Sequence, residues 1–141
     1  MNSTKQILEK RIHHPYWIYE SMQMIPDMLT QCLEDGVQSQ VNAVVEQLQY
    51  RKIDKIFLLG RGSSYFATLS LRYLFSAIVD IPVSASVTNL FDTYPPRNIN
   101  KKTAVFILST SGKSEGDKQV IQFAKSYGAY TVAVTDIEGT I

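Results

Sequence analysis

The chain has 141 residues, of which 45% are hydrophobic, and a formal net charge of +1 at pH 7. This composition suffices for one good hydrophobic core and gives no sign of disorder, so one domain is the first expectation. Residues of both charges are mixed along the chain, which argues against nucleic acid or an anionic membrane as a partner. No apolar run approaches the roughly 18 residues that a membrane span needs, and the N-terminus lacks the apolar core of a signal peptide.

The single cysteine, Cys32, can form no disulfide within the chain, which favours a reducing compartment. Its place in a helical pattern predicts a small buried hydrophobic residue. His13 and His14 are adjacent, so on a helix their side chains point in different directions and make a poor metal site. We therefore expect a cytoplasmic protein that holds no metal and no cofactor.

Residues 1–50 show no strand-like alternation and are predicted to form a helical lead-in to a domain at residues 51–141. Pro15 and Pro26 each suit the first turn of a helix, and Gly36 separates the second of these helices from a third.

The first two predicted helices are more apolar than a lone surface helix tolerates. Their large apolar side chains are Tyr16, Trp17, Tyr19, Met22, Met24 and Ile25. Two interpretations stay open. These side chains pack against a second domain or subunit, or they complete the core of this domain.

An apolar run at residues 56–59 predicts the first strand, and it continues directly into the segment GRGSSY at residues 60–65. Two glycines in this order resemble the start of a dinucleotide-binding fingerprint, but Tyr65 stands where the third glycine belongs, so we discount that interpretation. The segment instead indicates a turn in which small residues let a ligand approach the backbone and in which Ser63 and Ser64 supply donors.

The rest of the chain alternates between helical and strand patterns. The predicted elements are a helix over 64–79, a strand over 82–87, a loop over 88–100 with a short helix at Leu90, a strand over 104–108, a helix that Gly128 ends, and a strand over 130–135. This alternation predicts an α/β fold, a flavodoxin-like doubly wound parallel sheet preceded by N-terminal helices. Such sheets bind ligands beyond the carboxyl ends of their strands, where the strand order reverses.

The strand at 104–108 runs through the hydroxyl-rich segment STSGKS, residues 109–114, straight into a helix. Such a turn is suited to anions, because the first amides of a helix lack internal partners, the helix dipole is positive there, and hydroxyls can donate to phosphate. A P-loop is excluded, because its first glycine would fall at Ile107. The alternative is that Ser111 or Ser114 only caps the helix.

The ordered pair GRGSSY and STSGKS resembles the two turns of a sugar isomerase (SIS) domain. The segment Ile18-Tyr19-Glu20 is similar to the helical lead-in of the isomerase half of glucosamine-6-phosphate synthase and of related phosphosugar isomerases and deglycases. The resemblance covers the chain from about Pro15 onward. It implies that the second turn holds the phosphate of a sugar phosphate, while the first turn helps and lines the sugar.

Carried over by position, the resemblance nominates eight binding residues, namely Gly62, Ser63, Ser64, Ser109, Thr110, Ser111, Gly112 and Ser114. Thr110 and Lys113 depart from the family, which commonly has glutamine and glutamate at these positions. Lys113 thereby brings a cation to the second turn.

The resemblance implies a parent protein that is an aldose–ketose isomerase or a deglycase acting on (amino)sugar 6-phosphates by general acid–base chemistry. The alternative is a non-catalytic phosphosugar-sensing domain of a regulatory protein, although residues 1–50 contain no basic recognition helix. No cysteine lies near residue 2, which argues against a complete amidotransferase.

The catalytic residues stay unassigned. The chain stops at Ile141, whereas the family continues to a fifth strand and a second domain that carries the proton-moving glutamate, histidine and lysine, so the SIS-type domain is expected to be incomplete here. Glu115 and Asp117 lie in the first turn of a helix, where carboxylates usually face solvent. We therefore expect phosphosugar binding without turnover, and self-association into a homodimer that covers the aromatic lead-in and the open sheet edge.

Overall fold

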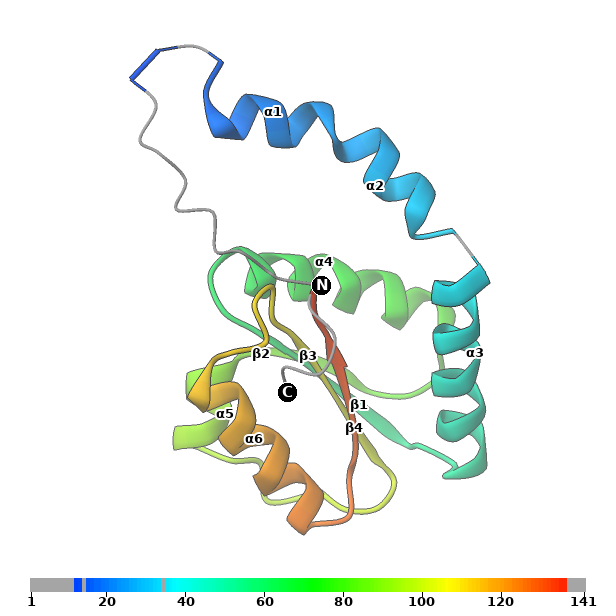
Figure 1. Ribbon diagram of the computed structural model, residues 1–141. Coiled ribbons are helices and arrows are strands. Elements are labelled where there is room, and N and C mark those ends of the chain that lie inside the picture. Colours follow the sequence, from blue (N-terminus) through cyan, green and yellow to red (C-terminus); the bar gives the residue numbers. More distant parts are fainter. Residues whose placement is uncertain (1–11, 14, 34, 137–141) are drawn as a thin grey trace. The chain divides into compact units, whose positions relative to one another are not determined.

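The computed structural model describes residues 12–13, 15–33 and 35–136 (Figure 1). The chain divides into two compact units, Met1–Asn42 and Ala43–Ile141, and the division falls inside α3 (Asp35–Tyr50). His14 and residues 1–11, the first part of the predicted helical lead-in, lie outside the described residues.

The first unit contains α1 (Trp17–Gln23) and α2 (Ile25–Gln31), with Pro26 in the first turn of α2 as predicted. Neither helix has a buried residue. Cys32, just past the end of α2, is exposed, so the prediction of a buried cysteine is wrong. Its helical pattern was real, but α2 has no buried face on which a small side chain could pack. The two interpretations of the apolar lead-in stay predictions.

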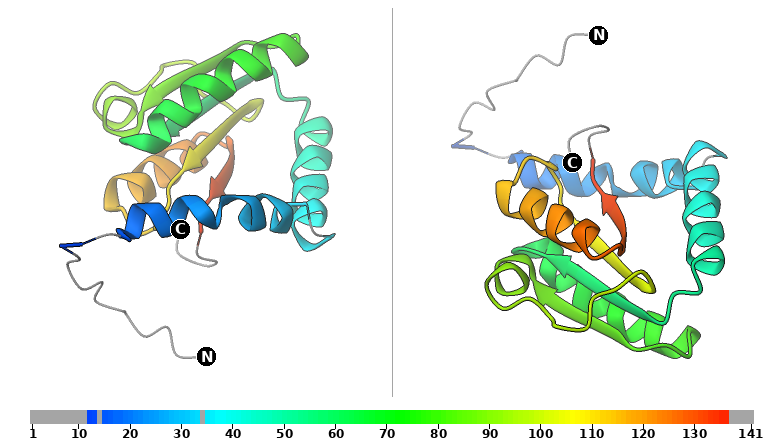
Figure 2. Two further views of the ribbon diagram at one scale, coloured as in Figure 1. Left: turned by 90° about the horizontal axis from the view of Figure 1, so that it is seen from above. Right: turned by 90° about the horizontal axis from the view of Figure 1, so that it is seen from below.

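The second unit is built on a parallel sheet of four strands in the order β2-β1-β3-β4. The strands are β1 (Lys55–Gly60), β2 (Val83–Val87), β3 (Thr103–Leu108) and β4 (Tyr130–Val134). The helices α4 (Ser63–Ile78), α5 (Thr88–Thr93) and α6 (Glu115–Ser126) connect them. Figure 2 shows α4 on one face of the sheet and α5 with α6 on the other. The predicted α/β fold is confirmed.

The core has two halves because alternate residues of a strand face opposite sides of the sheet. Ile56 and Leu58 of β1 pack on the side that includes Phe75 of α4. Leu59 packs on the other side, with Phe91 and with the apolar face of α6, which consists of Val120, Ile121 and Ala124. A strand buried on both faces is apolar throughout, which explains the continuous apolar runs of β1 and β3.

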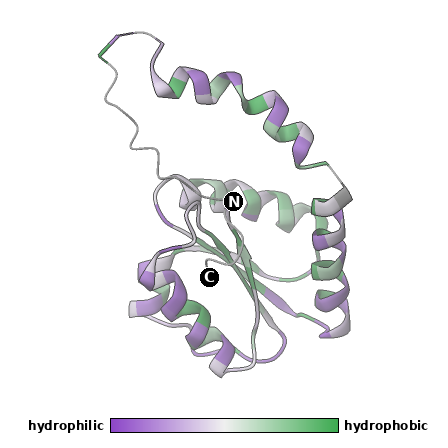
Figure 3. Ribbon diagram, viewed as in Figure 1, coloured by the Kyte–Doolittle hydropathy of each residue, from purple (hydrophilic) through white to green (hydrophobic). Residues whose placement is uncertain are grey.

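The amphipathic character of α6 is visible in Figure 3 as alternating hydrophobic and hydrophilic stretches. Its end is fixed by Gly128, which has φ +77° and whose N–H donates to the carbonyl of Lys125 at 2.9 Å. The N–H of Ala129 donates back to the carbonyl of Ala124 at 3.1 Å, which completes a Schellman motif. The predicted glycine stop is confirmed.

The strand order reverses between β1 and β3, because the chain leaves β1 toward β2 on one side and leaves β3 toward β4 on the other. Gly60 and Leu108, the last residues of these two strands, are paired in the sheet. The register therefore makes the two serine-containing turns begin side by side, at the crevice where parallel sheets bind ligands. No helix in the described part of the chain is long and apolar enough to cross a membrane.

Candidate functional site

The first turn follows β1 and is closed by its own backbone. The N–H of Ser64 donates to the carbonyl of Arg61 at 3.1 Å, and Gly62 between them has φ +53° and ψ −127°. This is the second position of a type II′ turn, which glycine dominates. A Cβ on Gly60 would lie 2.7 Å from the carbonyl carbon of Ser64, so α4 starts in direct contact with the end of β1. The two glycines thereby bring Ser63 and Ser64 to the crevice.

The second turn follows β3 and is organised by hydroxyls. Ser114 is the N-cap of α6, and its Oγ accepts a hydrogen bond from the N–H of Asp117 at 3.4 Å. The Oγ of Ser111 accepts from the N–H of Lys113 at 3.3 Å. The capping role proposed for Ser114 is therefore present. A hydroxyl that accepts in a cap still has its own hydrogen to donate, so this role leaves room for a ligand contact.

The second turn is also tied to the neighbouring strand end. The N–H of Ser109 donates to the carbonyl of Val134 at 3.0 Å, and the N–H of Asp136 donates to the carbonyl of Thr110 at 3.2 Å. Gly112 has φ +58° and its N–H donates to the carbonyl of Ser109 at 3.2 Å. These bonds fix the turn on both of its sides.

A cavity of about 310 Å³ opens between the two turns. Its lining consists of Arg61, Gly62, Ser63, Ser64, Leu108, Ser109, Thr110, Ser111, Ser114 and Asp117. The structure thus brings together every residue nominated from the resemblance except Gly112, which is buried and does not line the cavity. The volume of the cavity lies at the lower end of the range for small-molecule sites.

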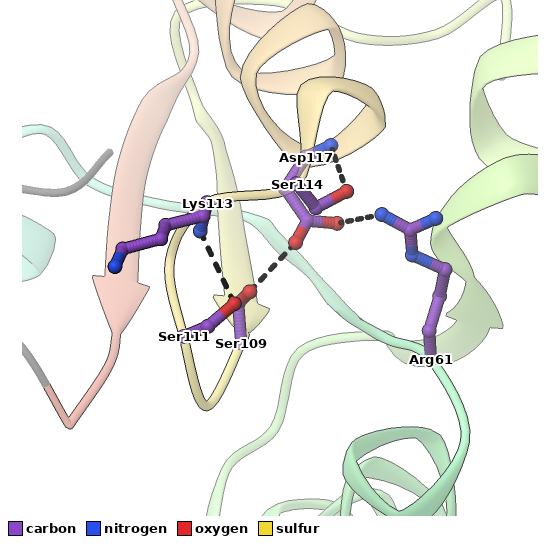
Figure 4. Close-up of polar contacts among 6 residues, drawn as sticks. All are labelled: Arg61, Ser109, Ser111, Lys113, Ser114 and Asp117. Carbon is purple, nitrogen blue, oxygen red and sulfur yellow. Dashed lines mark hydrogen bonds and ion pairs between the residues drawn. The ribbon is translucent and has the colours of Figure 1, made fainter. Parts of the chain in front are cut away.

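Asp117 was expected in solvent, and this prediction is wrong, because the residue is only 4% exposed. Its carboxylate accepts a hydrogen bond from the Oγ of Ser109 at 2.7 Å and lies 3.5 Å from the guanidinium of Arg61 (Figure 4). The reason is helical spacing. Asp117 precedes Val120 by three residues and Ile121 by four, so it shares the face of α6 that packs on the sheet. Glu115 is exposed, as expected.

The sequence reasoning therefore missed Asp117 and Arg61 as site residues. The signal for Asp117 was its spacing from the apolar face of α6, together with Ser114 three residues earlier, a capping-box pattern. Only half of that box forms. The Asp117 N–H bonds to Ser114, while its carboxylate turns to Ser109 and Arg61. Arg61 follows β1 directly, at a position where a long side chain reaches the crevice.

Among the residues that line the cavity, Arg61 and Asp117 are the charged ones, and their charges offset each other. Lys113 extends from the far side of the turn, away from this pair (Figure 4). The remaining polar lining is neutral hydroxyl and backbone. Within the described part of the chain, no group of three or more His, Cys, Asp or Glu residues is placed to hold a metal ion.

Residues 49–141 match the SIS domain family. The chain belongs to this family. Its relatives include the glutamine–fructose-6-phosphate aminotransferase (isomerizing) of Clostridium acetobutylicum, which is 27% identical over an alignment that covers 94% of this chain and 25% of that protein. The chain thus spans a quarter or less of the length of the curated relatives that it matches.

Two solved structures share the fold of this SIS domain. Tagatose-6-phosphate ketose/aldose isomerase from Escherichia coli is 22% identical with a TM-score of 0.68, over 86% of this chain and 35% of that one. The C-terminal domain of glucosamine-fructose-6-phosphate aminotransferase from Francisella tularensis is 16% identical with a TM-score of 0.71, over 87% of this chain and 34% of that one.

Proposed function

We propose that this SIS domain binds a hexose 6-phosphate in the cavity between its two turns, as part of an aldose–ketose isomerase or a deglycase acting on (amino)sugar 6-phosphates. The observation that carries this proposal is the cavity itself. It lies at the point where the strand order reverses and is lined by hydroxyls from two strand-to-helix turns. Relatives whose names include fructose 6-phosphate or tagatose 6-phosphate support the substrate class.

In this proposal the phosphate lies at the second turn. The hydroxyls of Ser111 and Ser114 accept hydrogen bonds from the backbone, so each has a hydrogen left to donate to a phosphate oxygen. Thr110 lies beside them on the cavity wall. The N-terminus of α6 adds the partial positive charge of a helix dipole at the same place. Ser63 and Ser64, across the cavity, then face the sugar.

Ser109 has a different hydrogen-bonding state, because its hydroxyl already donates to the Asp117 carboxylate. A hydroxyl has a single hydrogen, so in this arrangement Ser109 can offer a ligand only its lone pairs. Phosphate oxygens need donors. We therefore assign the larger share of phosphate binding to Ser111 and Ser114, with Ser109 as the weaker of the nominated contacts.

We propose further that these 141 residues bind without turnover. General acid–base isomerisation needs a base within hydrogen-bond reach of the proton that moves. Asp117 is the carboxylate that lines the cavity, and it is engaged by both Ser109 and Arg61. The same observation favours the second candidate, a phosphosugar-sensing domain. A ketose-to-aldose assay on the full parent protein separates the two candidate functions. An isomerase should show turnover in this assay, and a sensor should show none.

Calorimetric titration tests the binding proposal directly. A hexose 6-phosphate should bind to the chain, and the unphosphorylated hexose should bind far more weakly, since it lacks the group that the second turn holds. Equal affinities would contradict the proposal. An isomerase assay on the same preparation should stay at background, and turnover that Asp117→Asn or Glu115→Gln abolishes would show that the base lies in these residues after all.

We also propose that the protein is a cytoplasmic homodimer. Four large apolar side chains of α4 are more than half exposed, namely Phe66, Tyr73, Leu74 and Ile78. Figure 3 shows hydrophobic colour along much of this helix. Exposed apolar surface of this kind is typical of an interface. Light scattering should show a dimer, and Tyr73→Lys with Ile78→Lys should shift it toward monomer if α4 takes part.

A further inference from the structure

Arg61 is the cation that lines the cavity, and its position depends on α6. It follows β1 directly, and its guanidinium lies 3.5 Å from the Asp117 carboxylate. The guanidinium also lies next to Gly116, where a Cβ would be 3.7 Å from an Arg61 terminal nitrogen, an ordinary contact distance. The guanidinium therefore lies against the first turn of α6, at the positive end of the helix that borders the second turn (Figure 4).

The guanidinium has donors left for a ligand. It carries five N–H groups, and its ion pair with Asp117 is the interaction that it forms within the described part of the chain. The Arg61 side chain is 39% exposed, whereas that of Asp117 is 6% exposed. One edge of the fork is thus held by a buried carboxylate while another faces the cavity, and arginine can bind a phosphate through two parallel hydrogen bonds.

Asp117 is itself held firmly. It lies on the buried face of α6, its N–H is bound by the Ser114 hydroxyl, and one carboxylate oxygen accepts from Ser109 at the end of β3. The other oxygen faces Arg61. A carboxylate anchored from two elements fixes the direction of a long, flexible side chain that comes from a third.

We propose that Arg61 is a specificity-determining residue that supplies positive charge to the phosphate of the ligand, and that Asp117 is the positioning residue that holds it at the cavity. This inference rests on the proposed function. It adds a charged contact to a site whose other contacts are neutral, so the site should select a doubly charged phosphate ester over a singly charged ester of the same shape. A phosphate ester is close to doubly charged at pH 8, because its second pKa is near 6.

The competing interpretation is that the Arg61–Asp117 pair only fastens the two turns together. A fastening role predicts lower stability and equal loss of every ligand. A role in charge selection predicts unequal loss for ligands of different charge.

The test is calorimetric titration at pH 8 and low salt with a hexose 6-phosphate and the matching hexose 6-sulfate, which carries one charge. The wild-type chain should prefer the phosphate. Arg61→Gln should lose roughly tenfold or more of its phosphate affinity, the scale of a charge-assisted hydrogen bond, and should lose less for the sulfate. Arg61→Lys should retain part of the preference, because it keeps the charge but lacks the fork. Arg72→Gln, which removes an exposed arginine of α4 outside the cavity lining, should change neither affinity.

Asp117→Asn completes the experiment, because it keeps the shape and can still accept from Ser109 while it releases Arg61. Its phosphate affinity should fall several-fold. A rise would mean that Asp117 merely repels the anion, and would overturn its positioning role. Equal losses for both esters in a folded Arg61→Gln, or no loss at all, would overturn the role of Arg61. A wild type that binds neither ester would instead overturn the proposed function, and this inference with it.

Discussion

The two turns that form the cavity begin at paired residues of β1 and β3, yet they are built differently. The first turn is closed by a backbone bond from Ser64 to Arg61 and depends on two glycines. The second turn also has a backbone bond and a glycine with positive φ, Gly112, but it adds hydrogen bonds to the hydroxyls of Ser111 and Ser114. Both turns connect a strand to a helix. The first is defined mainly by close packing, and the second mainly by hydrogen bonds to side-chain hydroxyls.

Both turns leave backbone amides for a ligand. At the start of α4, the amides of Ser64, Tyr65 and Phe66 all donate to carbonyls of the turn itself. In the second turn, the amides of Thr110 and Ser111 form no hydrogen bond within the described part of the chain. The same is true of the amides of Gly62 and Ser63 in the first turn, so amide donors for a ligand are present at both turns. The first turn contributes close packing, two serines and the cation Arg61.

The largest effect is expected from Gly60→Ala, which disturbs the close packing of the first turn. The new methyl group would meet the Ser64 backbone at 2.7 Å, and backbone cannot move aside as a flexible side chain can. We expect a loss of about 1 to 3 kcal/mol in the free energy of unfolding, the usual cost of overpacking, together with loss of ligand binding. Urea unfolding with a phosphosugar titration measures both.

The matched control is Gly116→Ala, where the methyl group would find ordinary contact distances, with 3.7 Å to Arg61 as the shortest. Its stability should be unchanged or slightly higher, because alanine is the better helix residue. A Gly60→Ala variant as stable as this control would show that close packing does not define the first turn.

The next largest effect is expected from removing the hydroxyls of the second turn. Ser111→Ala and Ser114→Ala should each weaken phosphosugar binding by about 1 to 3 kcal/mol, the scale for hydrogen bonds to a charged group. Ser114→Ala should also lower stability by about 0.5 to 2 kcal/mol, since it removes the cap of α6. Ser126→Ala at the other end of α6 is the control, because its hydroxyl donates to the Phe123 carbonyl and lies outside the cavity lining. Turn variants that fold and bind like wild type would reduce both serines to caps.

The fold was predictable because its signals are local. Apolar runs marked β1 and β3, and Gly128 marked the end of α6, so the alternation of strands and helices could be read without knowledge of any distant contact. The exposure of Cys32 could not be read in this way. A helical pattern predicts a helix, but whether a given face is covered depends on what packs against it.

The candidate site was predictable to the same degree. Serine and glycine turns at strand ends stand out in the sequence, and all but Gly112 of the nominated residues line one cavity. Arg61 and Asp117 were missed because their contact depends on the pairing of Gly60 with Leu108, which brings two distant turns together. The general tendency of first-turn carboxylates to face solvent was outweighed here by the buried face of α6.

The smallest effect is expected at the serines of the first turn. Ser64→Ala and Ser63→Ala should each weaken binding of a hexose 6-phosphate by about 0.5 to 1.5 kcal/mol, the range for neutral hydrogen bonds, because these hydroxyls are assigned to the sugar. The affinity for inorganic phosphate, measured by competition with the hexose 6-phosphate, should be unaffected by either change. Ser111→Ala in the same assay should weaken both ligands. If Ser64→Ala reduced phosphate binding as much as Ser111→Ala does, the phosphate would lie between the turns. The assignment of the phosphate to the second turn and of the sugar to the serines of the first would then be wrong.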